Sequence, residues 1–152
     1  MTQNDLVIDR TIDAPVSLVW RCWTEKDLLS QWWCPAPWRA EVTALEHVPG
    51  GAFDTVMHGP DGEEFAGEGC ILVSDPERRV IFTSAMKRGF RPQPSDLPFT
   101  ARIEMSGRGE RTHYVATVMH MTEEHRKQHE DMGFLDGWGA AIGQLEKLAA
   151  RL

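Results

Sequence analysis

The sequence predicts a single α+β domain over residues 1–152, in which a curved antiparallel sheet of six or seven strands is covered by one long C-terminal helix. A chain of 152 residues can bury roughly two-thirds of the surface that it exposes when unfolded, which favours one domain. Segments with strand-like alternation fill the middle of the chain, and a helical stripe fills its end. Short turn signals between the strands favour antiparallel neighbours over crossover helices.

The first elements are predicted to be a strand and two short helices. Apolar residues alternate over residues 6–12, which indicates a half-buried strand with Arg10 on its buried side. Pro15 is well placed for the first turn of a short helix. Thr24, with an acid three residues later, resembles a capping box and predicts a second short helix that ends at about Trp32.

Residues 38–120 have the pattern of strands separated by turns. Clusters such as Gly59-Pro60-Asp61-Gly62 mark the turns. The longer segment Lys87–Pro98 holds three prolines and is expected to be irregular. The predicted strands span Trp38–Glu46, Ala52–His58, Glu63–Ser74, Arg79–Met86, Phe99–Ser106 and Arg111–His120.

The end of the chain predicts one long helix that Thr122 caps and that continues to Leu152. Four glycines flank its apolar stripe, and each costs roughly 0.8–1 kcal/mol relative to alanine in a helix interior. Either the helix packs closely on the sheet at these positions, or the small residues leave room for a ligand. The glycines are Gly133, Gly137, Gly139 and Gly143, and the stripe is Leu135, Trp138, Ile142, Leu145, Ala149 and Leu152.

Composition excludes several classes of function. A net charge of −7 argues against nucleic acid or an anionic membrane surface as partner. No run of eighteen apolar residues is present, so no spanning helix is expected. The N-terminus lacks the basic start and apolar core of a signal peptide. Cys22, Cys34 and Cys70 are odd in number and widely spaced, which predicts a reduced, cytoplasmic protein.

Motifs for metal, cofactor or nucleophile chemistry are missing, and we expect neither a metal nor a cofactor. His125 and His129 have the spacing of two metal ligands on a helix, but no third ligand is evident, so both are expected to be exposed and solvated. His120 ends a strand just before the helix, and Arg10 also points inward. Each is a candidate to orient a ligand's carboxylate or carbonyl, or to satisfy buried backbone.

A curved sheet that grips a helix tends to leave an apolar hollow, and such hollows are common ligand sites. Methionine and aromatic side chains recur on one side of the predicted strands. Methionine is flexible and is common on surfaces that adapt to varied ligands. The same rows are also compatible with an ordinary core. The candidate cavity residues are Phe53, Met57, Phe82, Met86, Met119, Met132 and Trp138, with His120 as polar anchor.

Five segments spread over nearly the whole chain carry a family resemblance. They are Ile12-x-Ala14-Pro15-x-x-x-Val19-Trp20-x-x-Trp23-Thr24, Leu29-x-x-Trp32-Trp33-x-Pro35, Gly50-Gly51-x-Phe53-x-x-x-Met57-x-Gly59-Pro60-Asp61-Gly62, Asp75-Pro76-x-Arg78-x-Val80-x-Phe82-Thr83 and His129-Glu130-x-Met132-Gly133-Phe134-x-x-Gly137-Trp138. Together they resemble the family named for the activator of Hsp90 ATPase, within the START-like or Bet v 1-like superfamily. The resemblance implies the helix-grip fold, a curved sheet around a long C-terminal helix with a cavity between them.

The resemblance leaves three hypotheses for function, because relatives include lipid carriers, plant hormone binders, polyketide cyclases and Hsp90 co-chaperone domains. The first is a binding protein for a small hydrophobic or aromatic metabolite or lipid, without catalytic activity. The second is a small-molecule enzyme similar to the polyketide cyclases, with His120 as general acid or base. The third is an Hsp90-binding module, but the separate N-terminal domain of the eukaryotic activator has no counterpart here, which argues against Hsp90 as partner. The sequence leaves a homodimer open.

Overall fold

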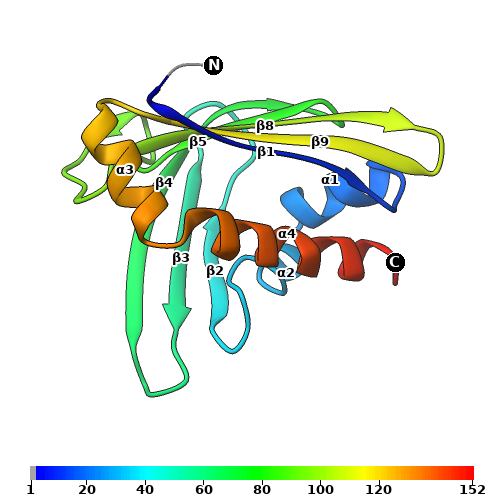
Figure 1. The fold of residues 1–152 in the computed structure, drawn as a ribbon, viewed down its shortest axis with the longest axis horizontal. Helices are drawn as coiled ribbons and strands as arrows, with labels where there is room; N and C mark the ends of the chain where they lie inside the picture. Colours follow the sequence, from blue (N-terminus) through cyan, green and yellow to red (C-terminus); the bar gives the residue numbers. More distant parts are fainter. Residues whose placement is uncertain (1–2) are drawn as a thin grey trace.

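The computed structural model describes residues 3–152; the first two residues, on which the signal-peptide argument partly rests, lie outside this range. Seven strands form one antiparallel sheet in the order β1-β9-β8-β5-β4-β3-β2 (Figure 1). This confirms the predicted α+β, helix-grip class. The strands are β1 (Asp5–Ile12), β2 (Arg39–Leu45), β3 (Ala52–His58), β4 (Glu64–Asp75), β5 (Arg79–Thr83), β8 (Phe99–Arg108) and β9 (Arg111–His120).

The sheet curves strongly around the terminal helix α4 (Phe134–Ala149). Figure 1 shows β2, β3 and β4 turned away from the direction of β1, β8 and β9, with α4 crossing the concave side. Register shifts between Val42 and Ala44 and between Ile71 and Val73 contribute to this curvature, because a bulge bends the strand that carries it. The curved sheet thereby surrounds α4 from two directions.

The two short helices follow β1 as predicted, but the second is shorter than expected. The first, α1 (Val16–Thr24), is followed by α2 (Lys26–Leu29), which ends before Trp32. Thr24 does not cap α2, because its hydroxyl donates to the carbonyl of Trp20, 3.1 Å away within α1. The predicted capping box was therefore wrong.

The predicted single C-terminal helix is broken into α3 (Glu123–Asp131) and α4. Thr122 caps α3 as expected, since its hydroxyl accepts from the backbone N–H of His125 at 3.1 Å. The break lies at Gly133, whose φ of +90° is a left-handed conformation that favours glycine. After the break Phe134 is buried, whereas Leu135 is 53% exposed, so the predicted stripe was wrong at its first residue. Leu152, at the far end of that stripe, is also exposed.

The strand predicted over Arg79–Met86 ends earlier, at Thr83. The hydroxyl of Thr83 donates to the carbonyl of Phe99 at 3.0 Å, which holds the end of β5 against β8. Met86 instead belongs to a separate pair of two-residue strands, β6 (Met86–Lys87) and β7 (Arg91–Pro92). The segment expected to be irregular therefore contains a short strand pair.

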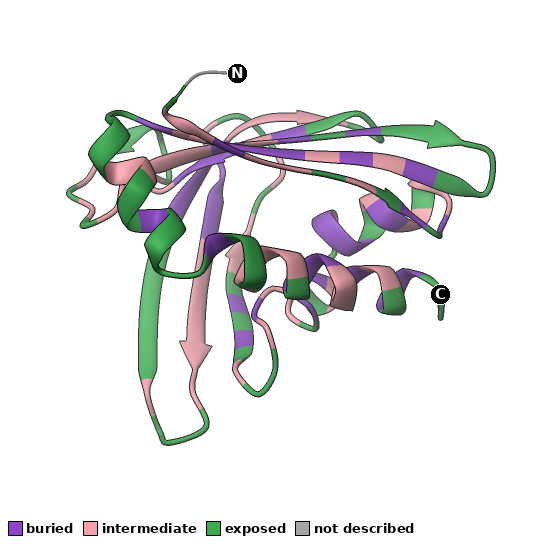
Figure 2. Ribbon diagram, in the orientation of Figure 1, coloured by how far each residue is buried: buried purple, intermediate pink, exposed green. Residues whose placement is uncertain are grey.

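The core is densest where α1 and the C-terminal half of α4 meet the sheet, and Figure 2 shows buried residues on all three. Leu145 on α4 and Val19 on α1 have no exposed surface. A buried hydrogen bond of 3.0 Å from the Trp23 indole to the Tyr114 hydroxyl ties α1 to β9. Among the helices of residues 3–152, none is long and apolar enough to cross a membrane.

Candidate functional site

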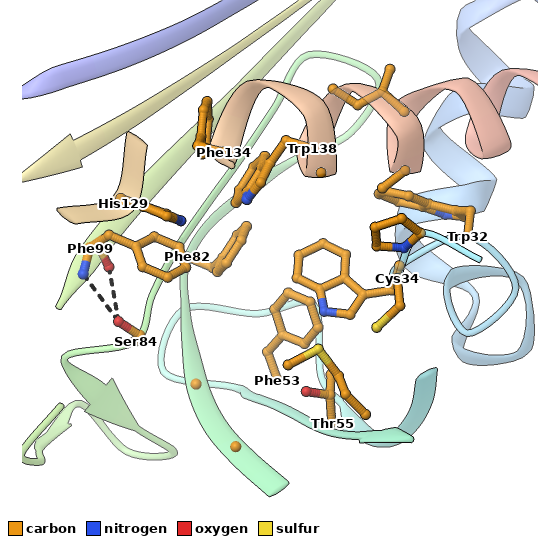
Figure 3. A pocket seen from close by; sticks show the side chains of 18 of the residues that line it. Trp32, Cys34, Phe53, Thr55, Phe82, Ser84, Phe99, His129, Phe134 and Trp138 are labelled. Atoms are coloured by element: carbon orange, nitrogen blue, oxygen red, sulfur yellow. Dashed lines mark hydrogen bonds between the residues drawn. The ribbon is translucent and has the colours of Figure 1, made fainter. Parts of the chain in front are cut away.

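A cavity of about 430 Å³ lies between the N-terminal half of α4 and the concave side of the sheet. Its walls come from the segment after α2, from β3, β4, β5 and β8, and from the junction of α3 and α4. Figure 3 shows the side chains of this wall converging from the strands below and from α4 above. The wall is mainly apolar and rich in aromatic side chains, which suits an apolar ligand.

Three aromatic rings form the centre of this wall. The ring centroids of Trp33 and Phe53 are 5.0 Å apart, those of Phe53 and Phe82 are 4.9 Å apart, and those of Trp33 and Phe82 are 5.8 Å apart. Sequence reasoning missed Trp33, because only its neighbour Trp32 fits the helical spacing of the second short helix. Two adjacent tryptophans cannot share one helix face, and that fact could have placed Trp33 elsewhere.

The β4 side of the cavity carries glycine at two alternate positions. Gly67 and Gly69 on β4 lie opposite Thr55 and Phe53 on β3, so all four face the same side of the sheet. A Cβ added at Gly67 would meet no atom within 4 Å, whereas a Cβ at Gly69 would lie 3.0 Å from the carbonyl oxygen of Phe53. Gly67 therefore leaves open space and Gly69 allows close approach of the backbone, and this G-x-G pattern was a usable signal that the sequence prediction overlooked.

The glycines of α4 divide between the two explanations that the sequence left open. Gly137 lines the cavity, and a Cβ there would meet nothing within 4 Å. Gly139 and Gly143 instead lie against Arg10, since Cβ atoms there would be 3.4 and 4.0 Å from its guanidinium nitrogens. Nη1 of Arg10 donates to the carbonyl of Gly139 at 3.1 Å. Arg10 therefore satisfies helix backbone, and it does not line the cavity.

Five of the eight residues named from the sequence line the cavity: Phe53, Met57, Phe82, Met132 and Trp138. Met132 is also 69% exposed, which places it where the cavity opens to solvent.

The other three, Met86, Met119 and His120, are outside the cavity lining. Met86 was misplaced because β5 ends before it. Met119 lies next to the fully buried Val118 in β9, and successive side chains of a strand point to opposite sides. His120 is on the correct side of the sheet, but another histidine lies between it and the cavity.

That histidine is His129 of α3, which is only 8% exposed, so the expectation that it is solvated was wrong. Its Nδ1 lies 2.9 Å from Nε2 of His120, and Nδ1 of His120 lies 2.7 Å from the carbonyl oxygen of Asn4. Burial lowers the pKa of His129 to about 4. His129 is therefore neutral at pH 7.

Charged groups are scarce in the lining. Glu68 is its one acid, and no lysine or arginine lines the cavity. Burial raises the pKa of the Cys34 thiol to about 11, so this cavity residue is not a thiolate at neutral pH. Within residues 3–152 no three His, Cys, Asp or Glu side chains are grouped to hold a metal ion.

The hydroxyls of Thr83 and Ser84, which also line the cavity, are already used. Ser84 accepts from the N–H of Phe99 at 3.1 Å (Figure 3). Thr83 donates to the carbonyl of Phe99, and Ser84 donates to the carbonyl of Leu97 at 3.4 Å. These bonds fix the junction of β5 and β8. They leave little hydrogen-bonding capacity on that wall.

Comparison with protein families matches residues 13–150 to the family described as activator of Hsp90 ATPase homolog 1-like protein. The chain belongs to this family. Its fold is the START-like, Bet v 1-like fold, which fits the binding of a ligand between sheet and helix.

Solved structures agree with this placement. A crystal structure of a protein from Nitrosomonas europaea is 41% identical, with a TM-score of 0.94, and the match covers 99% of this chain and 97% of that one. A crystal structure of a protein from Mycobacterium smegmatis is 28% identical, with a TM-score of 0.81 over 96% and 90% of the two chains. A solution structure from Arthrobacter aurescens, 23% identical with a TM-score of 0.87 over 99% and 88%, shares the fold. Comparison with curated proteins finds no match.

Proposed function

We propose that this protein binds a small, neutral, hydrophobic or aromatic molecule in the cavity beneath α4. The observation that carries the proposal is the β4 floor, where Gly67 lines the cavity and a Cβ would meet nothing within 4 Å. A core under selection for stability alone would fill this space, because an unfilled apolar cavity costs stability in proportion to its volume. Binding of an apolar ligand would recover that contact area.

The chemistry of the wall supports an uncharged ligand. No lysine or arginine lines the cavity to pair with a carboxylate or phosphate, and Arg10 is held by the carbonyl of Gly139. A buried unpaired anion is strongly disfavoured in such surroundings. A lipid bound here would therefore keep an anionic head group outside the cavity.

The experiment is to identify what the purified protein carries. Native mass spectrometry followed by solvent extraction should detect an apolar species at a stoichiometry near one per chain. Titration with naphthalene, an uncharged aromatic probe, should then shift the NMR signals of the Trp33 and Trp138 indoles. Absence of a bound species, together with no response to naphthalene, would remove the proposal.

An enzymatic function in the same cavity is the second hypothesis, and the structure changes its candidate base. His120 does not line the cavity, whereas His129 does. A general base is most effective when its pKa lies near the working pH, but burial lowers the pKa of His129 to about 4. This favours binding over proton abstraction. Turnover of a cyclisable polyketide that is lost in His129→Phe would reverse that preference.

The third hypothesis takes its partner from the family description. An ATPase assay with Hsp90 tests it, since stimulation at micromolar concentrations of this chain would establish a chaperone role. The cavity supplies no argument for that role, because a protein partner would contact the surface. The cytoplasmic location stays a prediction from the cysteines.

A further inference from the structure

Two ring nitrogens at the α3–α4 end of the cavity have no hydrogen-bond partner among residues 3–152. Within the part of the chain that the structure describes, Nδ1 of His129 is hydrogen-bonded but its Nε2 is not, and the indole N–H of Trp138 has no acceptor. The two ring centroids are 6.4 Å apart at an angle of 79°. Figure 3 shows both rings directed into the cavity beside Phe82.

The hydrogen bonds behind His129 determine which of its nitrogens carries the proton. The carbonyl of Asn4 can only accept, so Nδ1 of His120 donates to it at 2.7 Å. A neutral imidazole has one donor and one acceptor, so Nε2 of His120 must accept from Nδ1 of His129 at 2.9 Å. Nε2 of His129 is then an unprotonated acceptor on the cavity side.

The neighbouring Trp138 offers the opposite function, because an indole N–H can only donate. An acceptor and a donor on neighbouring rings suit one ligand group that can do both. A hydroxyl oxygen meets that requirement, since it donates its hydrogen to one partner and accepts from the other. A carboxylate fails it, because it cannot donate to His129 and no cation lines the cavity.

We infer that His129 and Trp138 form a hydroxyl-recognition site, and that the ligand is an aromatic or apolar molecule bearing a neutral alcohol or phenol. The inference rests on the proposed binding function and adds the chemical group that the cavity selects. His129 and Trp138 contact the ligand, and His120 is a positioning residue that fixes the tautomer of His129. The lowered pKa of His129 agrees with this role, because the ring stays neutral at pH 7.

Three probes of one shape test the site. 2-Naphthol can donate and accept, 2-methoxynaphthalene can only accept, and naphthalene can do neither. We expect the wild-type protein to bind 2-naphthol about 3- to 10-fold more tightly than 2-methoxynaphthalene, as one net hydrogen bond provides. His129→Phe should abolish this difference, because phenylalanine offers no acceptor at that position. Trp138→Phe should abolish the smaller difference between 2-methoxynaphthalene and naphthalene.

The outcomes separate the two proposals. If none of the probes binds, both the binding function and the hydroxyl site are overturned. If all three bind equally to the wild-type protein, only the hydroxyl site is overturned, and this comparison holds even where a variant fails to fold. Nitrogen-15 NMR of the histidine rings is the readout for His120: the wild-type protein should have the Nδ1-protonated tautomer at His129, and His120→Phe should lose it. An Nε2-protonated His129 in the wild-type protein would contradict the inference.

Discussion

The two halves of α4 face the same sheet, yet one half is packed and the other is hollow. At the C-terminal half, Leu145 and Ala149 have no exposed surface, and α1 closes the space beside them. At the N-terminal half, Gly137 and Trp138 stand over the cavity. Both halves come from one continuous helix, so the difference lies in what faces it. Side chains of α1, among them Val19, close the space at one end, and Gly67 of β4 leaves space at the other.

Within α4, the residues that stabilise the fold are therefore separate from the residues that border the cavity. Burial of aliphatic side chains provides most of the stabilisation of a fold, and here it is concentrated away from the cavity. The cavity end can therefore remain unfilled without unfolding the domain. Substitutions at the packed end should change the free energy of unfolding, and substitutions at the cavity end should mainly change ligand affinity.

The largest expected effect is at the packed end. Leu145→Ala should lower the free energy of unfolding by about 2–4 kcal/mol, because it removes fully buried methyl groups and leaves a cavity. Met57→Ala at the cavity end should cost less than about 1 kcal/mol, since its side chain already borders empty space. Urea denaturation of both variants measures the difference. Equal losses would contradict the division of α4 into a packed half and a hollow half.

The next effect is a loss of stability in acid that originates at the cavity end. An unfolded histidine has its ordinary pKa of 6.5, whereas the folded pKa of His129 is about 4. Below pH 6.5 this histidine becomes protonated in the unfolded chain, whereas in the folded protein it stays neutral down to about pH 4. The free energy of unfolding therefore falls between about pH 6.5 and 4. We expect a loss on the order of 2 kcal/mol.

Urea titrations at several pH values measure this loss, and His129→Phe should remove most of it. His47, whose pKa burial also lowers, adds a loss of the same sign that the variant should retain. A wild-type slope that is unchanged in His129→Phe would show that the acid sensitivity originates elsewhere.

A third prediction fills the cavity from its floor. Gly67→Val should place a branched side chain opposite Thr55, where a Cβ meets nothing within 4 Å, and should weaken naphthalene binding by at least about tenfold, worth about 1.4 kcal/mol. Valine suits a strand, so stability should not fall. Ala66→Val, on the opposite side of the same strand, is the matched control and should leave binding unchanged. Naphthalene affinity of both variants, measured by NMR titration, decides the test.

The smallest effect compares two glycines of α4 two positions apart. Gly137→Ala should raise the free energy of unfolding by about 0.5–1 kcal/mol, because alanine favours the helix and its Cβ meets nothing within 4 Å. Gly139→Ala should gain less, since its Cβ would touch the guanidinium of Arg10 at 3.4 Å. Thermal unfolding of the two variants, side by side, measures this. A larger gain at Gly139 would mean that Arg10 does not depend on the close approach.

Much of the fold and part of the candidate site could be predicted from local pattern. Alternation placed Phe53, Met57 and Phe82 on the inner side of the sheet, because strand geometry alone determines the side to which a residue points. The same rule, applied to β9, would have excluded Met119. The family motifs identified the class of fold, which the structure confirms.

What local pattern could not supply was the distance between side chains on different elements. His120 and His129 each have an ordinary sequence context, and only the turn between β9 and α3 brings their rings to within hydrogen-bonding distance. That contact decides which histidine reaches the cavity and which nitrogen it presents there.

The glycines summarise the division between sequence and tertiary structure. Helix propensity is a local property, so the sequence by itself determined that the glycines make the terminal helix less stable and leave their positions without side chains. Whether that space holds Arg10, as at Gly139, or opens into the cavity, as at Gly137, depends on which strand lies opposite. Only the curvature of the sheet decides this, because it brings β1 to one part of α4 and leaves the glycines of β4 beneath another.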